Sequence, residues 1–377
     1  MIEILSDNII SPLGFTSEEN YLNVKQGKSG IRTYDNIFDV GRQVSCSRMD
    51  GDLLDAEFQK VTGLSPADYT RLEKASLTSA SKAIDASGID PKSPRVGFYL
   101  STTKGNVELL DQNLFYDPRL YLWNTAYKIA DFFGNPNKCT VVSNACISGI
   151  CAIIAASRAI ESGRIDYAVV TGADVLSRFV VSGFGCLKAL SADPCKPFDK
   201  DRKGLNLGEA SATVVLRKAV EGSGNLKFLK GSIRNDANHI SGPSRTAEGA
   251  FNALNDILQD FDKSQIAFVS THGTATAFND EMESIAIDRM QLTGKPVNAF
   301  KGYYGHTLGA AGVLEAIIAK HSIMDNTVIR TLGFENLGTS KQINPTSENL
   351  ATDKRYFVKL ISGFGGSNAA ALFKKEV

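Results

Sequence analysis

Histidine and tryptophan are rare in this chain of 377 residues, which contains four His and one Trp, and neither sign of charge is in excess. The 41 basic residues (Lys and Arg) balance the 41 acidic residues, so the formal net charge is zero. A neutral chain creates no overall field that attracts nucleic acid or an anionic membrane, so neither is expected as a partner. A charged partner must instead bind a local patch.

Long hydrophobic runs are also missing, and no leader peptide is expected. No apolar stretch reaches about 18 residues without a charge, so no membrane span is expected. The N-terminal segment MIEILSDNIISPLG carries acids where a signal peptide needs basic charge. The six scattered cysteines include no Cys-x-x-Cys pair. This pattern is typical of reduced thiols in the cytoplasm rather than of a disulfide framework or a zinc site, so no metal is expected.

Short strand-like runs alternate with helix-like segments along the chain, which predicts an α/β fold. Residues 96–100 and 266–269 are apolar runs typical of buried strands, and residues 69–87 carry apolar side chains at helical spacing. A chain of 377 residues exceeds what one ordinary core needs, so we expect two domains or a duplicated one. The GSG segment at 222–224 is the best candidate for the boundary.

Cys146 stands between a predicted strand, residues 140–142, and a predicted helix whose apolar residues begin at 147. The first turn of a helix leaves backbone N–H groups unpaired, and these lower the pKa of a nearby thiol and can bind a developing oxyanion. Cys146 is therefore either a nucleophile or a small packing residue. The motif alone leaves both interpretations open.

Two of the four histidines stand in loops next to regular elements, where α/β folds place their ligands. His272 lies in THGTAT, directly after a strand-like run, and His306 lies in FKGYYGHTLGAAG, before an apolar helix. Both are candidate site residues, with a core position as the alternative. We expect a structural role for His239 and a surface position for His321.

A possible ion pair and a glycine-rich turn complete the candidate set. Glu315 is the only acid in the apolar helix predicted over residues 313–322, and a buried acid needs a partner, for which Lys301 is the candidate. In SGFGGSN (362–368), Gly363 and Gly365 permit tight turns and close approach to a ligand, and Phe364 projects from between them. A plain turn is the alternative for this segment.

Taken together and in this order, these motifs resemble those of the elongating β-ketoacyl-acyl-carrier-protein synthases, which are condensing enzymes of the thiolase superfamily. The similarity covers nearly the whole chain. It is carried by SPLG (11–14), GKSGI (27–31), NACISG (144–149), KPFDKDRKGLNLGEA (196–210), NDANHISGP (235–243), THGTAT (271–276), KGYYGHTLGAAGVLEA (301–316) and GFGGSN (363–368). The resemblance implies a duplicated five-layer α-β-α-β-α fold of the thiolase type. Residues 1–217 would form the half with the cysteine, and residues 218–377 the half with the histidine pair.

The resemblance also implies a reaction, the decarboxylative Claisen condensation of an acyl-enzyme thioester with malonyl-acyl carrier protein. Cys146 would be the nucleophile that accepts the acyl chain. His272 and His306 would assist decarboxylation and stabilise the enolate, and Lys301 with Glu315 would support the second of these histidines.

Further roles follow from the same resemblance. Phe364 would gate the acyl pocket, and its N–H, with that of Cys146, would form the oxyanion hole. Thr274 and Thr276 would contact the phosphopantetheine arm, and Gly363 and Gly365 would border the substrate. Asp280 and Glu209 would support the structure.

The implied partners are an acidic acyl carrier protein and a second subunit, in a cytoplasmic homodimer or in a heterodimer with a related subunit. The substrates would arrive on the carrier's phosphopantetheine, with no separate cofactor. Candidate cations for binding the carrier are Arg71, Lys74 and Lys203.

Several alternatives were weighed against this function. Thiolases need a second cysteine near the C-terminus, whereas the last cysteine here is Cys195. Chain-initiating synthases use asparagine in place of one histidine, and the Lys301 pattern does not fit a papain-like hydrolase. A non-catalytic chain-length subunit usually lacks the nucleophile.

The chain departs from the family pattern in two places. Gly302 and Tyr304 stand where the family usually has Ser and a small Thr or Leu, and LSTTKGN (100–106) replaces a more glycine-rich loop near the acyl pocket. Acyl length therefore stays open, as does the choice between fatty-acid elongation and a specialised pathway such as aryl-polyene synthesis.

Overall fold

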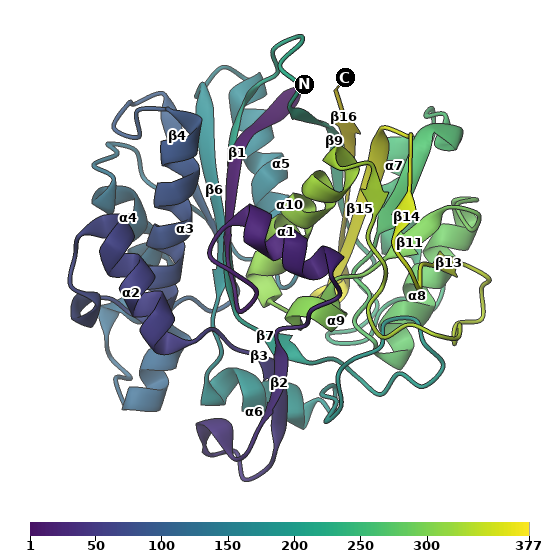
Figure 1. The fold of residues 1–377 in the computed structure, drawn as a ribbon, viewed down its shortest axis with the longest axis horizontal. Helices are drawn as coiled ribbons and strands as arrows, with labels where there is room; N and C mark the ends of the chain where they lie inside the picture. The colour runs from purple at the N-terminus through teal and green to yellow at the C-terminus, as the bar shows by residue number, and fades with distance from the viewer. Residues whose placement is uncertain (377) are drawn as a thin grey trace.

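Within residues 1–376, which the computed structural model describes, a mixed sheet of 11 strands runs through the molecule in the order β13-β11-β10-β15-β16-β9-β1-β8-β6-β4-β5 (Figure 1). Its strands are β1 (Ile2–Ile10), β4 (Val96–Ser101), β5 (Thr140–Val142), β6 (Tyr167–Asp174), β8 (Ala210–Lys218), β9 (Leu226–Asn235), β10 (Ile266–Ser270), β11 (Pro296–Asn298), β13 (Asn344–Pro345), β15 (Tyr356–Gly363) and β16 (Ser367–Lys375). Smaller sheets are formed by β2 (Ile31–Tyr34), β3 (Val44–Ser47) and β7 (Leu207–Gly208), and by β12 (Thr327–Val328) and β14 (Leu350–Ala351).

The same strand arrangement occurs twice in the large sheet. In the first half-sheet, β5-β4-β6-β8-β1, β4 is parallel to β5 and β6, and β6-β8-β1 are antiparallel. The second half-sheet, β11-β10-β15-β16-β9, repeats this pattern strand for strand. A short antiparallel pairing of β1 with β9 joins the two. The division between residues 217 and 218 stays a prediction, which this repetition supports.

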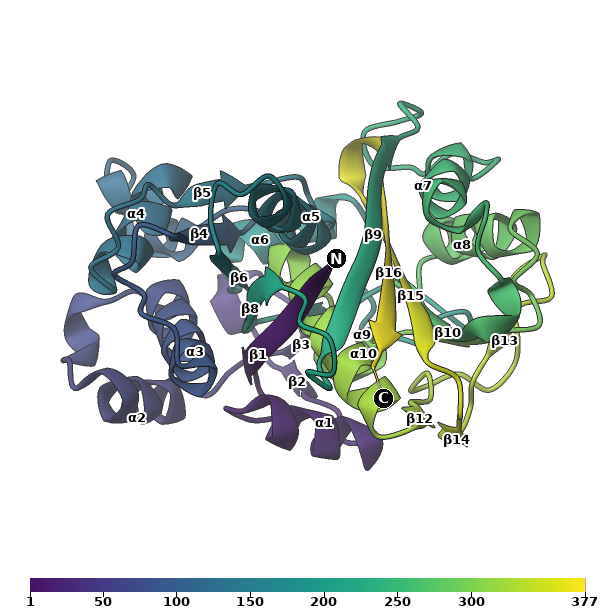
Figure 2. The same ribbon diagram turned by 90° about the horizontal axis from the view of Figure 1, so that it is seen from above.

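Helices form three layers around the two half-sheets (Figure 2). They are α1 (Ser17–Lys25), α2 (Gly51–Thr62), α3 (Arg71–Ser87), α4 (Leu122–Phe132), α5 (Ser148–Glu161), α6 (Arg178–Cys186), α7 (Glu248–Leu258), α8 (Ala277–Arg289), α9 (Lys301–Tyr304) and α10 (Ala311–Met324). α3 packs on β8 and β1 at one outer face, and α7 packs on β16 and β9 at the other. α5 and α10 lie between the half-sheets and contact each other. The predicted five-layer α-β-α-β-α fold is therefore confirmed.

Local sequence explains where the helices begin and end. α3 begins at Arg71 because the Thr70 hydroxyl accepts the amide of Glu73, whose carboxylate accepts the amide of Thr70 in return. It ends at Gly88, whose φ of 69° is left-handed. No helix in the part of the chain that the structure describes is long and apolar enough to cross a membrane.

The two central helices touch through glycines at their N-terminal ends. A Cβ at Gly149 would lie 2.6 Å from the Val313 nitrogen, and one at Gly312 would lie 2.6 Å from the Ile150 nitrogen. Only glycine therefore permits the contact. Because the helices touch here, the loops that precede them also lie together, and those loops carry Cys146 and His306.

His321 was expected on the surface, and the structure places it half-buried, with 27% of its side chain exposed. Its Nε2 lies 2.9 Å from Asp7 of β1, and Asp7 also forms an ion pair with Lys320. Burial raises the pKa of Asp7, but the charge of Lys320 and the hydrogen bond from His321 outweigh burial, so the pKa lies below its usual value of 3.8. The ion pair therefore connects α10 to the first half-sheet.

Replacing Asp7 with asparagine is expected to lower the free energy of unfolding at pH 7 by about 3 kcal/mol, because removal of one partner leaves a nearly buried lysine uncompensated. Since the folded-state pKa is depressed, the contribution is complete above pH 3.8 and is lost as the pH falls below that value. Urea unfolding at pH 7 and at pH 3 measures both effects. Asp166→Asn, which breaks the exposed pair with Arg95, is the control and should cost less than about 1 kcal/mol. Equal losses in the two variants at pH 7 would contradict the assignment.

Candidate active site

Cys146 lies in a tight turn between β5 and α5. Ala145 has a φ of 45°, which is left-handed and uncommon for alanine. Ser148 holds the turn, because its hydroxyl donates to the Ala145 carbonyl at 2.6 Å and accepts the Asn144 amide at 2.8 Å. The turn positions the sulfur beside the loop that precedes α10.

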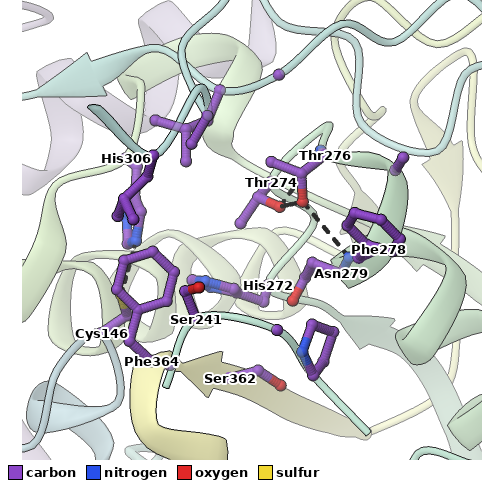
Figure 3. Close-up of a pocket in the computed structure, with 18 of the residues that line it drawn as sticks. Cys146, Ser241, His272, Thr274, Thr276, Phe278, Asn279, His306, Ser362 and Phe364 are labelled. Carbon is purple, nitrogen blue, oxygen red and sulfur yellow. Dashed lines mark hydrogen bonds between the residues drawn. The ribbon is translucent and has the colours of Figure 1, made fainter. Parts of the chain in front are cut away.

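Both candidate histidines meet Cys146 in one site, as Figure 3 shows. His306 Nε2 lies 2.9 Å from Cys146 Sγ, and the rings of His306 and His272 lie 4.9 Å apart at 81°. All three side chains are more than nine-tenths buried. The structure therefore brings together residues that are up to 160 positions apart in the sequence.

The His306 ring is held by its own loop. Its Nδ1 accepts the Leu308 amide at 3.3 Å, so the proton of a neutral ring is on Nε2 and points toward the sulfur. The His306 amide donates to Asn206, and its carbonyl accepts from Gly208. Burial, followed by the charge of Lys301, holds the pKa of His306 well below 6.5. His306 is therefore a neutral hydrogen-bond donor near neutral pH.

Lys301 and Glu315 form the predicted buried ion pair, but they support the other histidine. Lys301 Nζ binds Glu315 Oε1 and lies 3.4 Å from His272 Nδ1. The resemblance implied that this pair supports His306, but in the structure the pair lies beside His272, because the chain turns at Gly305 (φ 65°) before His306. Burial, followed by the charge of Lys301, also holds the pKa of His272 well below 6.5.

The pKa of the Cys146 thiol is raised, whereas a helix N-terminus alone would lower it. Burial raises the pKa of the thiol to about 11, and the charges of Lys301 and Lys104 and the Phe364 amide only partly offset it. The expected effect of the helix N-terminus does not outweigh desolvation in the closed site. Cys146 is therefore protonated near neutral pH and must lose its proton as it reacts.

The glycine-rich segment 362–368 forms one wall of the site. A Cβ at Gly363 would lie 3.0 Å from the Cys146 nitrogen, so glycine allows the two backbones to approach. Gly365, at φ 80°, donates its amide to the Ile240 carbonyl and ties this segment to the loop that carries His239. Phe364 stacks on Phe184 with ring centroids 5.7 Å apart. Its ring stands beside Cys146 in Figure 3.

A cavity of about 500 Å³ connects the site to the surface. Cys146 and both histidines line its inner part, and Thr274 and Thr276, whose hydroxyls are 2.8 Å apart, line the path outward. Phe278, which is 77% exposed, stands at the mouth. The sulfur is thus buried, but a narrow, extended substrate can reach it through the cavity.

His239 also borders this cavity, although its expected role was structural. Its Nδ1 accepts the amides of Ser241 and Gly242, which stabilises the turn after it. The interactions of Asp280 and Glu209 fit the expected structural support. Asp280 accepts the amides of Phe198, Thr274 and Ala275, and Glu209 accepts those of Met49 and Leu176.

Two of the three cations proposed for carrier binding are not available for it. Arg71 pairs with the fully buried Glu209 at 2.8 Å, and Lys74 pairs with Asp55 with only 14% of its side chain exposed. Lys203 lines the cavity with 71% of its side chain exposed, and its pair with Asp193, at 3.2 Å, is exposed to solvent on both sides. Charge on an amphipathic helix does not reveal which cations are already paired, and this explains the error.

One buried group of the site was missed from the sequence. Lys359 of β15 is fully buried, and its Nζ lies 2.7 Å from Glu315 Oε2. A signal was present, because a lone lysine inside the apolar run YFVKLI is costly to bury without an acid.

Comparison with known proteins agrees with this site and fold. The family model described as "Beta-ketoacyl synthase, N-terminal domain" matches residues 1–221, and the model of the C-terminal domain matches residues 228–335. The chain belongs to the β-ketoacyl synthase family. It is a condensing enzyme, and the predicted family and enzyme class are confirmed.

Individual relatives are moderately similar over nearly their whole length. The 3-oxoacyl-[acyl-carrier-protein] synthase 2 of Vibrio cholerae is 28% identical, with 97% of each chain covered. The tetracenomycin polyketide synthase ketoacyl synthase alpha subunit of Streptomyces glaucescens is 28% identical, with 93% of this chain and 91% of the relative covered. A solved structure titled "The ishigamide ketosynthase/chain length factor" has a TM-score of 0.87 and 26% identity, and the match covers 100% of this chain and 99% of the other.

Proposed function

We propose that Cys146 accepts an acyl chain from a carrier-protein thioester and that His272 and His306 activate a malonyl thioester for condensation with it. The observation that carries this proposal is the meeting of one thiol and two neutral imidazoles at the inner part of a cavity that opens to the surface. Thioester exchange suits a thiol, which is both a nucleophile and a leaving group.

In the first step, the Cys146 sulfur attacks the thioester carbonyl. A new C–S bond forms, the carrier's C–S bond breaks, and the proton lost by Cys146 leaves with the carrier thiol. The amides of Cys146 and Phe364 stabilise the oxyanion, and one such donor typically lowers a barrier by roughly 3–4 kcal/mol.

In the second step, the malonyl thioester loses carbon dioxide as its C–C bond breaks, and the electron pair forms an enolate. The Nε2–H groups of His272 and His306 donate hydrogen bonds to the enolate oxygen. The enolate carbon then attacks the acyl carbonyl, so that a C–C bond forms, the C–S bond to Cys146 breaks and the released thiolate takes a proton from water that enters through the cavity.

The phosphopantetheine arm is proposed to lie between Thr274 and Thr276 along the outer cavity, with no separate cofactor. Gly363 and Gly365 would leave room for the acyl end. For the acidic carrier, Lys203 is kept as a candidate, and Lys188, also at the cavity wall, replaces Arg71 and Lys74. A reducing cytoplasmic location is supported by cysteines that are all free within residues 1–376.

A dimer is proposed through the edge of the first half-sheet. β5 lies at the end of the large sheet with β4 as its one neighbour, which leaves its outer edge open to a second chain. Large exposed aromatic side chains gather in the segment before β5. They are Phe115, Tyr116, Tyr121, Trp123 and Tyr127. The second subunit is a copy of this chain or, as in the ishigamide ketosynthase structure, a chain-length factor.

The pathway is fatty-acid elongation or a specialised polyketide-like elongation, since relatives of both kinds match the chain equally well. A non-catalytic partner subunit is the alternative function. The convergence of Cys146, His272 and His306 favours the enzyme.

An acyl carrier protein loaded with a cysteine-directed electrophilic acyl analogue is expected to label Cys146. The imidazole beside the sulfur and the open cavity are the physical reason. Peptide mass spectrometry locates the added mass and separates Cys146 from the exposed Cys186, which serves as the control for non-specific alkylation. A folded protein that stays unlabelled at Cys146 with its cognate carrier would favour the non-catalytic subunit.

A further inference from the structure

The buried ion pair behind His272 has a second lysine, whose environment leaves it no contact with solvent. Lys359 is fully buried, and its ammonium donates to the carbonyls of Thr271 and Leu360 at 2.8 and 3.0 Å, with Ser270 at 3.3 Å. Ser270 and Thr271 directly precede His272. The ammonium therefore fixes the end of the strand from which His272 projects.

Glu315 is shared between the two lysines. Its Oε1 binds Lys301, and its Oε2 lies 2.7 Å from Lys359. Each oxygen therefore has its own cation, which holds the carboxylate in one orientation. Lys301 Nζ, fixed by this pair, also lies 3.4 Å from His272 Nδ1.

The direction of that last contact decides which nitrogen of His272 carries the proton. An ammonium donates and cannot accept, so Nδ1 is the acceptor and the proton of the neutral ring lies on Nε2. The ammonium groups of Lys301 and Lys359 also lie behind the ring, and nearby positive charge disfavours an imidazolium.

We propose that Lys359 is a positioning residue for the condensation, because it holds Glu315 and Lys301 in the arrangement that keeps His272 neutral with its proton on Nε2. The inference rests on the proposed role of His272 and adds a residue to it. A merely structural Lys359 would only tie β15 to the end of β10.

The charged and titratable groups around His272 come from every element packed against it. They are Lys301 on α9, Lys359 on β15, Glu315 on α10, Glu283 on α8, whose carboxylate accepts the His272 amide, His306 in the loop before α10, and Cys146 before α5. Of these, Lys301 and Lys359 carry the fixed positive charge.

Lys359→Met, which keeps the chain length and removes the charge, tests the proposal by ¹⁵N-histidine NMR. The chain has four histidines, so each ring can be assigned with single His variants. In the native protein, His272 is expected to stay neutral between about pH 5 and 8, with its proton on Nε2. In Lys359→Met, its titration midpoint is expected to rise by about one pH unit or its tautomer to become mixed. His321 should be unchanged.

Kinetics provide the second readout. Lys359→Met is expected to lower kcat for malonyl decarboxylation about tenfold, while KM for the malonyl carrier and the rate of Cys146 acylation change less than about twofold. The matched control is Lys227→Met, which removes a buried strand lysine paired with Glu376 outside the site. It should change neither the NMR signals nor kcat.

The outcomes separate the two proposals. Unchanged His272 signals and an unchanged kcat in Lys359→Met overturn the role of Lys359. Persistent decarboxylation in His272→Ala instead overturns the proposed role of His272. If Lys359→Met does not fold, Lys359→Gln retains an amide donor for the carbonyls without the charge and is judged by the same signals.

Discussion

Alanine at position 146 is expected to reduce condensation by roughly 10⁴-fold or more, because the chain then has no atom to hold the acyl group. The nearby thiol of Cys151 cannot replace it. That side chain packs in the core one helical turn further along α5, and burial raises its pKa to about 12. Steady-state condensation with acyl and malonyl carriers measures the loss.

Cys151→Ala is the matched control for this variant. It removes a buried thiol from the same helix without touching the histidines, so its activity should stay within about twofold of the native value. Condensation that survives Cys146→Ala would mean that another group carries the acyl chain. Equal losses in both variants would point to a packing defect.

Alanine at position 272 is expected to reduce malonyl decarboxylation by roughly 10²–10⁴-fold while Cys146 still accepts an acyl chain. Decarboxylation and acylation are expected to respond differently because His306, and not His272, contacts the sulfur at 2.9 Å. Release of carbon dioxide from labelled malonyl carrier measures one half-reaction, and protein mass measures the other.

His321→Ala serves as the control because its ring lies at Asp7, outside the cavity. It should lower stability and leave decarboxylation unchanged at a temperature where it is folded. Full condensation by His272→Ala would remove His272 from the mechanism. A loss of Cys146 acylation in the same variant would show that the two histidines do not have separate tasks.

Periodicity predicted most of the elements that position the site. The strands at 96–100, 140–142 and 266–269 and the helix at 69–87 are present with small shifts at their ends. β9 and β16 were not predicted. β16 contains the run NAAALF, which has no clear strand period. In β9 the strand pattern of the sequence is broken by Gly231, where a Cβ would lie 2.5 Å from Ile154.

The sequence predicted which residues form the site better than it predicted their contacts and pKa values. The family resemblance assigned Lys301 and Glu315 to His306, whereas Lys301 lies beside His272 in the structure; the turn at Gly305 decides this outcome. The thiol pKa could not be predicted from the sequence either. Helix position is visible in a sequence, whereas desolvation depends on layers packed from distant segments. Lys359 was missed because its partner, Glu315, lies on another element.

The contact between the thiol and the imidazole joins an atom from residue 146 to one from residue 306, across two helices that meet at Gly149 and Gly312. During translation at about 5–20 residues per second, the imidazole is made roughly 10–30 s after the sulfur. A nascent or truncated chain thus carries a thiol with no partner ring beside it. The site is complete only when the chain has been made through residue 306 and the two helices have packed against each other.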